Sequence, residues 1–204
     1  MNRNWTHNER TAAGMIALLV AVTFAVQTFA NADRDGSALA AFLLLFRYFT
    51  IWTNFATGIV MGLIALGRRL PSYVPFSLAS ALSVVGLVYH ALLAADHHPV
   101  GLEWWTNLAF HTIIPVAGIS WWLVATRAQA HGWRALPCAM IAPIIYTGFA
   151  LLYGAASGFY PYFFLDRSSL GWPQLLLNIA GLSLFFLFMG TILMGLRSAF
   201  ARLL

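Results

Sequence analysis

The 204-residue sequence has few charged residues, no lysine and a single cysteine. Only 8% of its residues are charged, whereas a typical soluble domain carries about 25%. The lone Cys138 excludes an internal disulfide and a cysteine-based metal site. Hydrophobic residues make up 61% of the chain instead. This composition predicts an integral membrane protein rather than a soluble domain.

Several motifs of well-known enzyme classes are also absent. The sequence contains no G-x-S-x-G nucleophile elbow, phosphate-binding loop, H-E-x-x-H zinc motif or dinucleotide fingerprint. Its net charge of +5 comes from arginines dispersed between apolar segments, so it does not indicate nucleic-acid binding.

Six apolar segments satisfy the requirement of about 20 residues for one bilayer crossing. They cover approximately residues 11–31, 38–66, 73–96, 104–126, 135–155 and 171–199. Because backbone polar groups must be hydrogen-bonded within lipid, these segments should be helices packed as a bundle. The sequence therefore predicts an all-α membrane protein, with one transmembrane domain of six helices spanning residues 1–204.

The connecting segments differ in charge between the two sides of the predicted bundle. Most basic residues fall on one side: Arg3, Arg10, Arg68, Arg69, Arg127, Arg134, Arg197 and Arg202. The other side holds Asp33, Asp35, Asp96, Glu103 and Asp166, with only Arg34 and Arg167 as extramembrane bases. The positive-inside rule then predicts cytoplasmic termini. Since a lysine-free composition suggests a GC-rich bacterial genome, we expect the bacterial inner membrane.

Aromatic residues cluster near the ends of the apolar segments. Examples are Trp104, Trp105, Trp133, Tyr160, Tyr162 and Trp172. Tryptophan and tyrosine favour the membrane–water interface, where an apolar ring and a polar tip are both accommodated. We therefore expect these residues to be interfacial anchors.

Polar residues interrupt four apolar segments at similar depth. At about 1.5 Å per residue, His111 lies about 12 Å, His90 about 9 Å and Asn178 about 10 Å from the outer ends of their segments. Thr50 lies about 24 Å above the inner boundary of a core about 30 Å thick. Polar groups are costly in lipid, so we expect them to face inward around a pocket in the outer half, suited to an amphiphile.

Helical spacing groups these residues into stripes, because residues three or four apart share a helix face. The stripes are Arg47, Thr50, Asn54 and Thr57; Asn107 and His111; Gln174 and Asn178; and Gln27 and Asn31. If every stripe turns inward, all of them line one pocket.

Thr50 and His111 form a candidate nucleophile and base. An imidazole can take the threonine proton as the oxygen attacks a carbonyl, and can then return that proton to the leaving alcohol. Asn107 could orient the ring or donate to an oxyanion, and Asn54 is a second candidate donor. Arg47 could bind a carboxylate or snorkel to the interface. The plain alternative for Thr50 is a hydroxyl bonded to the carbonyl one turn earlier.

Three segments of the chain carry a family resemblance. They are Tyr48-Phe49-Thr50; Trp105-Thr106-Asn107-Leu108-Ala109-Phe110-His111-Thr112 with Pro115; and Ser157-Gly158-Phe159-Tyr160-Pro161-Tyr162-Phe163-Phe164-Leu165. In order and approximate spacing they resemble the androgen-induced membrane hydrolases. Those are multi-span threonine hydrolases of fatty-acid esters of hydroxy fatty acids. The resemblance implies that Thr50 is the nucleophile and His111 the catalytic histidine.

The leading hypothesis is an intramembrane lipid esterase that acts on fatty-acid esters. It has Thr50 and His111 as the catalytic pair, needs no metal or cofactor, and has a lipid ester as substrate among the membrane lipids. Its supporting or substrate-binding residues are Arg47, Asn54, His90, Asn107 and Asn178. The oligomeric state is not predicted.

Two alternatives remain open at this point. One interpretation of His90 is a satisfied structural histidine, and another is that His90 and His111 ligate a b-type haem in an electron-transfer protein. The other alternative is a protein that binds or transports a small solute. The scarcity of polar residues in the inner halves of the segments argues against a route through the membrane.

Overall fold

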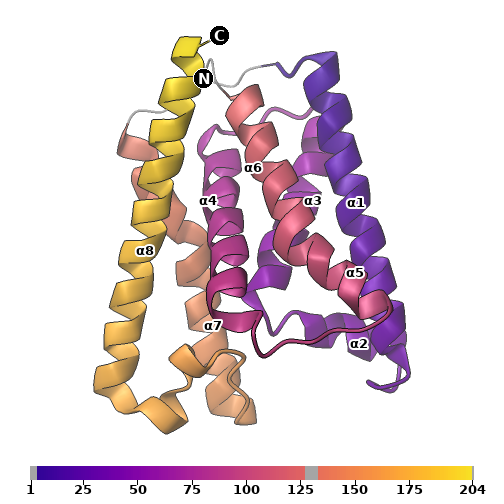
Figure 1. Ribbon diagram of the computed structural model, residues 1–204, viewed down its shortest axis with the longest axis vertical. Coiled ribbons are helices and arrows are strands. Elements are labelled where there is room, and N and C mark those ends of the chain that lie inside the picture. Colours follow the sequence, from indigo (N-terminus) through magenta and orange to yellow (C-terminus); the bar gives the residue numbers. More distant parts are fainter. Residues whose placement is uncertain (1–3, 127–132, 204) are drawn as a thin grey trace.

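The computed structural model describes residues 4–126 and 133–203, and none of these residues lies in a strand. Figure 1 shows the helices packed as one bundle. They are α1 (His7–Ala32), α2 (Ala38–Leu45), α3 (Phe49–Ala65), α4 (Tyr73–Val88), α5 (Leu102–Leu108), α6 (Ile114–Ala125), α7 (Ile141–Ser157) and α8 (Arg167–Leu203). The π-helical segments are η1 (Tyr89–Leu93) and η2 (Ala109–Ile113), and the 3-10 segments are η3 (Trp133–Met140) and η4 (Phe163–Leu165).

The predicted all-α fold with membrane-length helices is confirmed for the described residues. Five helical stretches are long and apolar enough to cross a membrane, and the number becomes six if α2 and α3 together form one crossing. Successive crossings run in opposite directions, so both described ends of the chain lie at the same end of the bundle (Figure 1). Arg3 and Arg127, part of the predicted basic side, lie outside the described residues.

The prediction of one continuous helix over residues 38–66 is wrong. The helix is interrupted at residues 46–48, and the axes of α2 and α3 are bent by 100° relative to each other. The break leaves backbone carbonyls without helical partners, and side chains replace those partners. Trp52 Nε1 donates to the Phe46 carbonyl at 2.6 Å, and the Tyr146 hydroxyl donates to the Arg47 carbonyl at 2.5 Å. Such replacement is what a helix break at membrane depth requires.

Two π-helical turns lie at the same level as this break. η1 continues α4, and η2 joins α5 to α6, whose second residue is Pro115. Because proline has no N–H to bond back along a helix, and its ring crowds the preceding turn, a π turn is a natural accommodation there. Gly86 of α4 faces η2 closely, since a Cβ at this position would lie 3.3 Å from the His111 carbonyl oxygen.

The core is divided along the length of the bundle. Near the chain ends, Trp5, Phe76, Trp121 and Trp122 belong to one buried cluster. Nearer the other end, Phe24 and its aromatic neighbours pack α1 against α2, α3 and η2. Helix α1 packs mainly on α3, while α4 contacts α6 and α8 on different sides. This packing places α3, α4 and η2 side by side, where the site is found.

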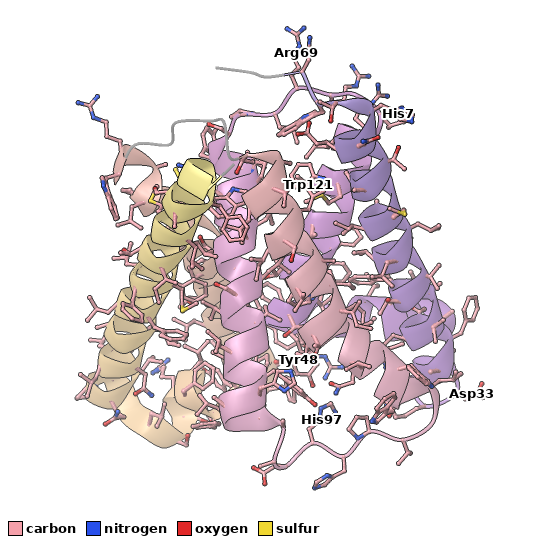
Figure 2. The ribbon with its side chains drawn as sticks, turned by 45° about the horizontal axis from the view of Figure 1, so that its top comes forward. His7, Asp33, Tyr48, Arg69, His97 and Trp121 are labelled. Carbon is pink, nitrogen blue, oxygen red and sulfur yellow. The ribbon has the colours of Figure 1, made fainter. Side chains whose placement is uncertain are left out.

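The two ends of the molecule differ in their polar residues. Figure 2 shows His7 and Arg69 at one end, and Asp33, Tyr48 and His97 at the opposite end. The first end carries the arginine-rich connections and Glu9, whereas the carboxylates of the three loops after α1, η1 and α7 lie at the second. We call the second end the loop end, and it holds the candidate site.

Candidate active site

The two predicted catalytic residues lie together in the structure. Thr50 is the second residue of α3, and His111 is the central residue of η2. The Thr50 Oγ1 atom lies 3.4 Å from His111 Nε2. His111 Nδ1 lies 3.0 Å from the Asn107 carbonyl oxygen, which can only accept a hydrogen bond. In the neutral ring the proton is therefore on Nδ1, and Nε2 is free to accept from the threonine hydroxyl.

Tyr89 stacks on one face of the His111 ring. The two rings stack with centroids 3.8 Å apart at an interplanar angle of 17°. Asn107 Nδ2 donates to the Tyr89 hydroxyl at 2.6 Å, and His97 Nδ1 lies 3.4 Å from the same hydroxyl. Asn107 therefore orients the imidazole in two ways. Its backbone carbonyl accepts from Nδ1, and its side chain donates to the hydroxyl of Tyr89, which stacks on the ring. The second contact was not anticipated from the sequence.

Asn54 joins the nucleophile helix to the histidine turn. Its side chain is fully buried, and its Nδ2 donates to the Thr50 carbonyl at 2.7 Å and to the Phe110 carbonyl at 3.1 Å. Both amide hydrogens are thus engaged, and none is left for an oxyanion. Asn54 is a positioning residue rather than the oxyanion donor considered from the sequence.

Tyr162 is a site residue that the sequence analysis assigned to the membrane interface. It is only 9% exposed and lies in the connection between α7 and α8, stacked on Phe164. Its hydroxyl accepts a hydrogen bond from the Phe49 N–H at 3.0 Å, beside Thr50 at the start of α3. The expectation of an interfacial anchor is therefore wrong for Tyr162. Tyr162 lies in one of the segments that carry the family resemblance, and this position was the sequence signal that could have placed it in the site.

Two cavities meet at Thr50. One has a volume of about 250 Å³ and lies among α3, α4, α7 and α8, with mainly apolar and aromatic walls. The other has a volume of about 460 Å³, reaches the loop end and is lined by polar residues that include His111 and Asn107. Thr50, Tyr89, Leu93 and Tyr162 line both. We call them the apolar cavity and the polar cavity.

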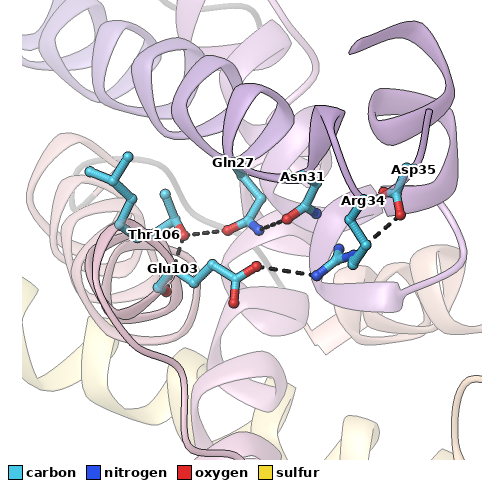
Figure 3. A network of polar contacts seen from close by, with 7 residues as sticks. Gln27, Asn31, Arg34, Asp35, Glu103 and Thr106 are labelled. Carbon is cyan, nitrogen blue, oxygen red and sulfur yellow. Dashed lines mark hydrogen bonds and ion pairs between the residues drawn. The ribbon is translucent and has the colours of Figure 1, made fainter. Parts of the chain in front are cut away.

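A polar network forms one rim of the polar cavity (Figure 3). Gln27 Nε2 donates to Asn31 Oδ1 at 3.1 Å, and the Thr106 hydroxyl donates to Gln27 Oε1. Arg34 forms an ion pair with Glu103 at 3.3 Å, linking the loop after α1 to α5. Hydrogen bonding to Asp35 raises the pKa of Arg34, so this rim holds a permanent cation. The Gln27 and Asn31 stripe thus lines the polar cavity, as the inward-facing prediction requires.

Other predicted site residues lie away from the catalytic pair. The Arg47 guanidinium stacks over Phe159 at 5.0 Å and does not line either cavity. Asn178 accepts from Gln174 at 2.8 Å and donates to the Phe164 carbonyl at 3.0 Å, so it attaches η4 to α8. The prediction that all stripes meet around one pocket is wrong for these two residues.

His90 is exposed, and its Nε2 lies 2.9 Å from Thr112 Oγ1. The His111 Nε2 faces Thr50 instead. Each candidate haem-ligating nitrogen is thus engaged by a threonine hydroxyl on a different element. In residues 4–126 and 133–203, no three His, Cys, Asp or Glu side chains are grouped to hold a metal ion.

Comparisons with models of protein families, with curated proteins and with solved structures found no match for this chain. Function must therefore be argued from the geometry of the site.

Proposed function

We propose that the protein is an intramembrane esterase in which Thr50 is the nucleophile and His111 the general base. The observation that carries the proposal is the 3.4 Å approach of Thr50 Oγ1 to His111 Nε2, with the ring oriented by the Asn107 carbonyl. A nucleophile within reach of a base that is itself oriented by a third group is the usual arrangement for covalent catalysis. The resemblance to the androgen-induced membrane hydrolases implies the same pair.

The proposed reaction has two steps. Thr50 Oγ1 attacks the ester carbonyl carbon while His111 Nε2 takes the hydroxyl proton, and the tetrahedral intermediate then expels the alcohol, which receives that proton. An acyl ester on Thr50 remains. A water molecule from the polar cavity then loses a proton to His111 and attacks this ester. Collapse of the second intermediate releases the fatty acid and returns the proton to Thr50.

Two features support stabilisation of the oxyanion. Thr50 lies in the first turn of α3, where the helix dipole favours negative charge. The Tyr162 hydroxyl accepts from the Phe49 N–H beside Thr50, and its own hydrogen is the one proposed to donate toward the reacting carbonyl. The break at residues 46–48 creates this helix start, so the interruption of the predicted helix has a direct chemical use.

The charge distribution supports an orientation for the protein. Arginine-rich connections at the end with the chain termini favour a cytoplasmic location for that end. The loop end and the polar cavity then face the outside of a bacterial inner membrane. Long-chain lipid esters present in that leaflet are the proposed substrates.

Replacement of Thr50 tests the proposal directly. Purified Thr50→Ala should lose esterase activity by roughly a thousandfold or more, since the covalent step has no nucleophile. Thr50→Ser should retain measurable activity and labelling by a fluorophosphonate probe. Thr57→Ala is the matched control, because Thr57 lies on the same helix and donates only to the Thr53 carbonyl. Undiminished hydrolysis by Thr50→Ala would show that the proposed nucleophile is wrong.

A further inference from the structure

The apolar cavity offers much less polar surface than the polar cavity. Its walls come from α3, α4, α7 and α8 and include the rings of Phe49, Tyr146, Phe164 and Phe186. The Ser183 hydroxyl also belongs to the wall, but it donates to the Ile179 carbonyl of its own helix at 2.8 Å. A cavity of this kind suits a hydrocarbon chain and not a polar solute.

This cavity extends from Thr50 toward the middle of the bundle. On α4, its lining residue Val84 precedes Tyr89 by five residues, which is about 7.5 Å along the helix. Tyr89 and Thr50 belong to the end shared with the polar cavity, whereas Val84 and Phe186 form part of a buried cluster farther in. A chain bonded to a carbonyl at Thr50 would therefore run toward the interior of the membrane.

The apolar cavity opens sideways between α7 and α8. Ile144 of α7 lines the cavity and is 63% exposed, so the cavity reaches the outer surface of the bundle there. Thr147 on α7 and Leu182 and Ser183 on α8 line it as well and are partly exposed. Ile144 lies about halfway along the candidate span Trp133–Ser157, a depth at which the surroundings are lipid hydrocarbon.

We infer that the apolar cavity is an acyl-chain subsite, entered sideways from the bilayer between α7 and α8. The ester carbonyl then lies at Thr50, the acyl chain descends past Ile144, and the alcohol part occupies the polar cavity. This is the orientation that a lipid already has in the outer leaflet, with its head outward and its tail inward. The inference rests on the proposed function and adds to it where the acyl chain of the substrate binds and from which side it enters.

Two cavity-filling variants test the subsite from opposite sides of the opening, Thr147→Phe and Ser183→Phe. The probes are p-nitrophenyl palmitate in phosphatidylcholine vesicles and p-nitrophenyl acetate in water, which share one leaving group. The palmitate-to-acetate ratio of kcat/KM should fall by roughly tenfold or more in each variant, since a phenyl ring displaces several methylene contacts. Ser198→Phe is the matched control, because Ser198 lies on α8 outside the cavity and makes the same type of hydrogen bond to Met194.

The outcomes separate the inference from the proposed function. A lower ratio in both filled variants, with no change in Ser198→Phe, supports an acyl subsite. An unchanged ratio in either folded variant overturns it even if the protein is an esterase, since the acyl chain would then bind elsewhere. If the unaltered protein hydrolyses neither ester, the proposed function itself is wrong and the inference falls with it.

Discussion

Polar side chains are used differently in the body of the bundle and at its loop end. In the body, hydroxyl groups mostly bond back to their own helix, as Thr57 does to the Thr53 carbonyl and Ser80 to the Phe76 carbonyl. At the loop end, polar groups bond across elements that are distant in sequence, as Asn54 does to the Phe110 carbonyl. Local bonds only satisfy a polar group, whereas the cross-element bonds fix where a functional group lies.

After Thr50→Ala, the largest effect is expected at His111, the proposed base. His111→Ala should lower kcat/KM by about 10²- to 10⁴-fold, because general base catalysis is lost while the rest of the site remains. In the unaltered protein, activity should also fall on acidification, since protonation of Nε2 removes the lone pair that accepts the threonine proton. Steady-state kinetics over a range of pH measure both effects. His7→Ala, at the opposite end, should behave like the unaltered protein, and equal losses in the two variants would contradict the assignment.

Tyr162→Phe should have the next largest effect, a loss of roughly 10²-fold in kcat with a smaller change in KM. Phenylalanine keeps the stacking on Phe164, so only the hydroxyl at the start of α3 is removed. Thermal unfolding in detergent checks that the fold is retained. The corresponding hydroxyl deletion Tyr153→Phe, in α7 outside both cavities, should leave kcat unchanged. A normal kcat for Tyr162→Phe would remove this tyrosine from the reaction.

Asn54→Leu compares a cross-element bond with a local one. It should lower the free energy of unfolding by about 1–3 kcal/mol, because the buried Phe110 carbonyl loses its donor from α3 in addition to the loss of the local bond to the Thr50 carbonyl. Thr57→Val, which removes only a bond within α3, should cost less than about 1 kcal/mol. Both values come from denaturant titration in detergent. Similar costs for the two variants would argue that cross-element bonds have no special role.

The smallest effect is expected from one added methyl group. A Cβ at Gly86 would lie 3.3 Å from the His111 carbonyl oxygen, so Gly86→Ala should displace η2 by a few tenths of an ångström and lower kcat severalfold. Gly148→Ala is the control, because nothing lies within 4 Å of its added Cβ. The test is to compare the kcat values of Gly86→Ala and Gly148→Ala by steady-state kinetics. Equal kcat values would show that the α4–η2 approach does not matter for turnover.

The sequence predicted the crossings well because their signal is compositional and strong. The break at residues 46–48 was missed, since that stretch contains neither proline nor glycine and the stabilising donors Trp52 and Tyr146 lie outside it. Thr50 and His111 could be paired from the sequence because they were predicted to lie at the same membrane depth and because a hydroxyl and an imidazole can react as nucleophile and base. Tyr162 could not be placed in the site from the sequence, because its burial depends on how the connection before α8 folds back. A tyrosine near the end of an apolar segment is equally typical of an interfacial anchor.

The break before α3 also has a consequence for assembly. The Arg47 carbonyl is bonded by Tyr146 and the Phe49 N–H by Tyr162, so both supports of this helix start come from residues far downstream. A chain that has inserted only as far as α6 already contains Thr50 and His111 but lacks these supports. The protein would therefore acquire its reactive geometry late in membrane insertion, when α7 and the connection that follows it have joined the bundle.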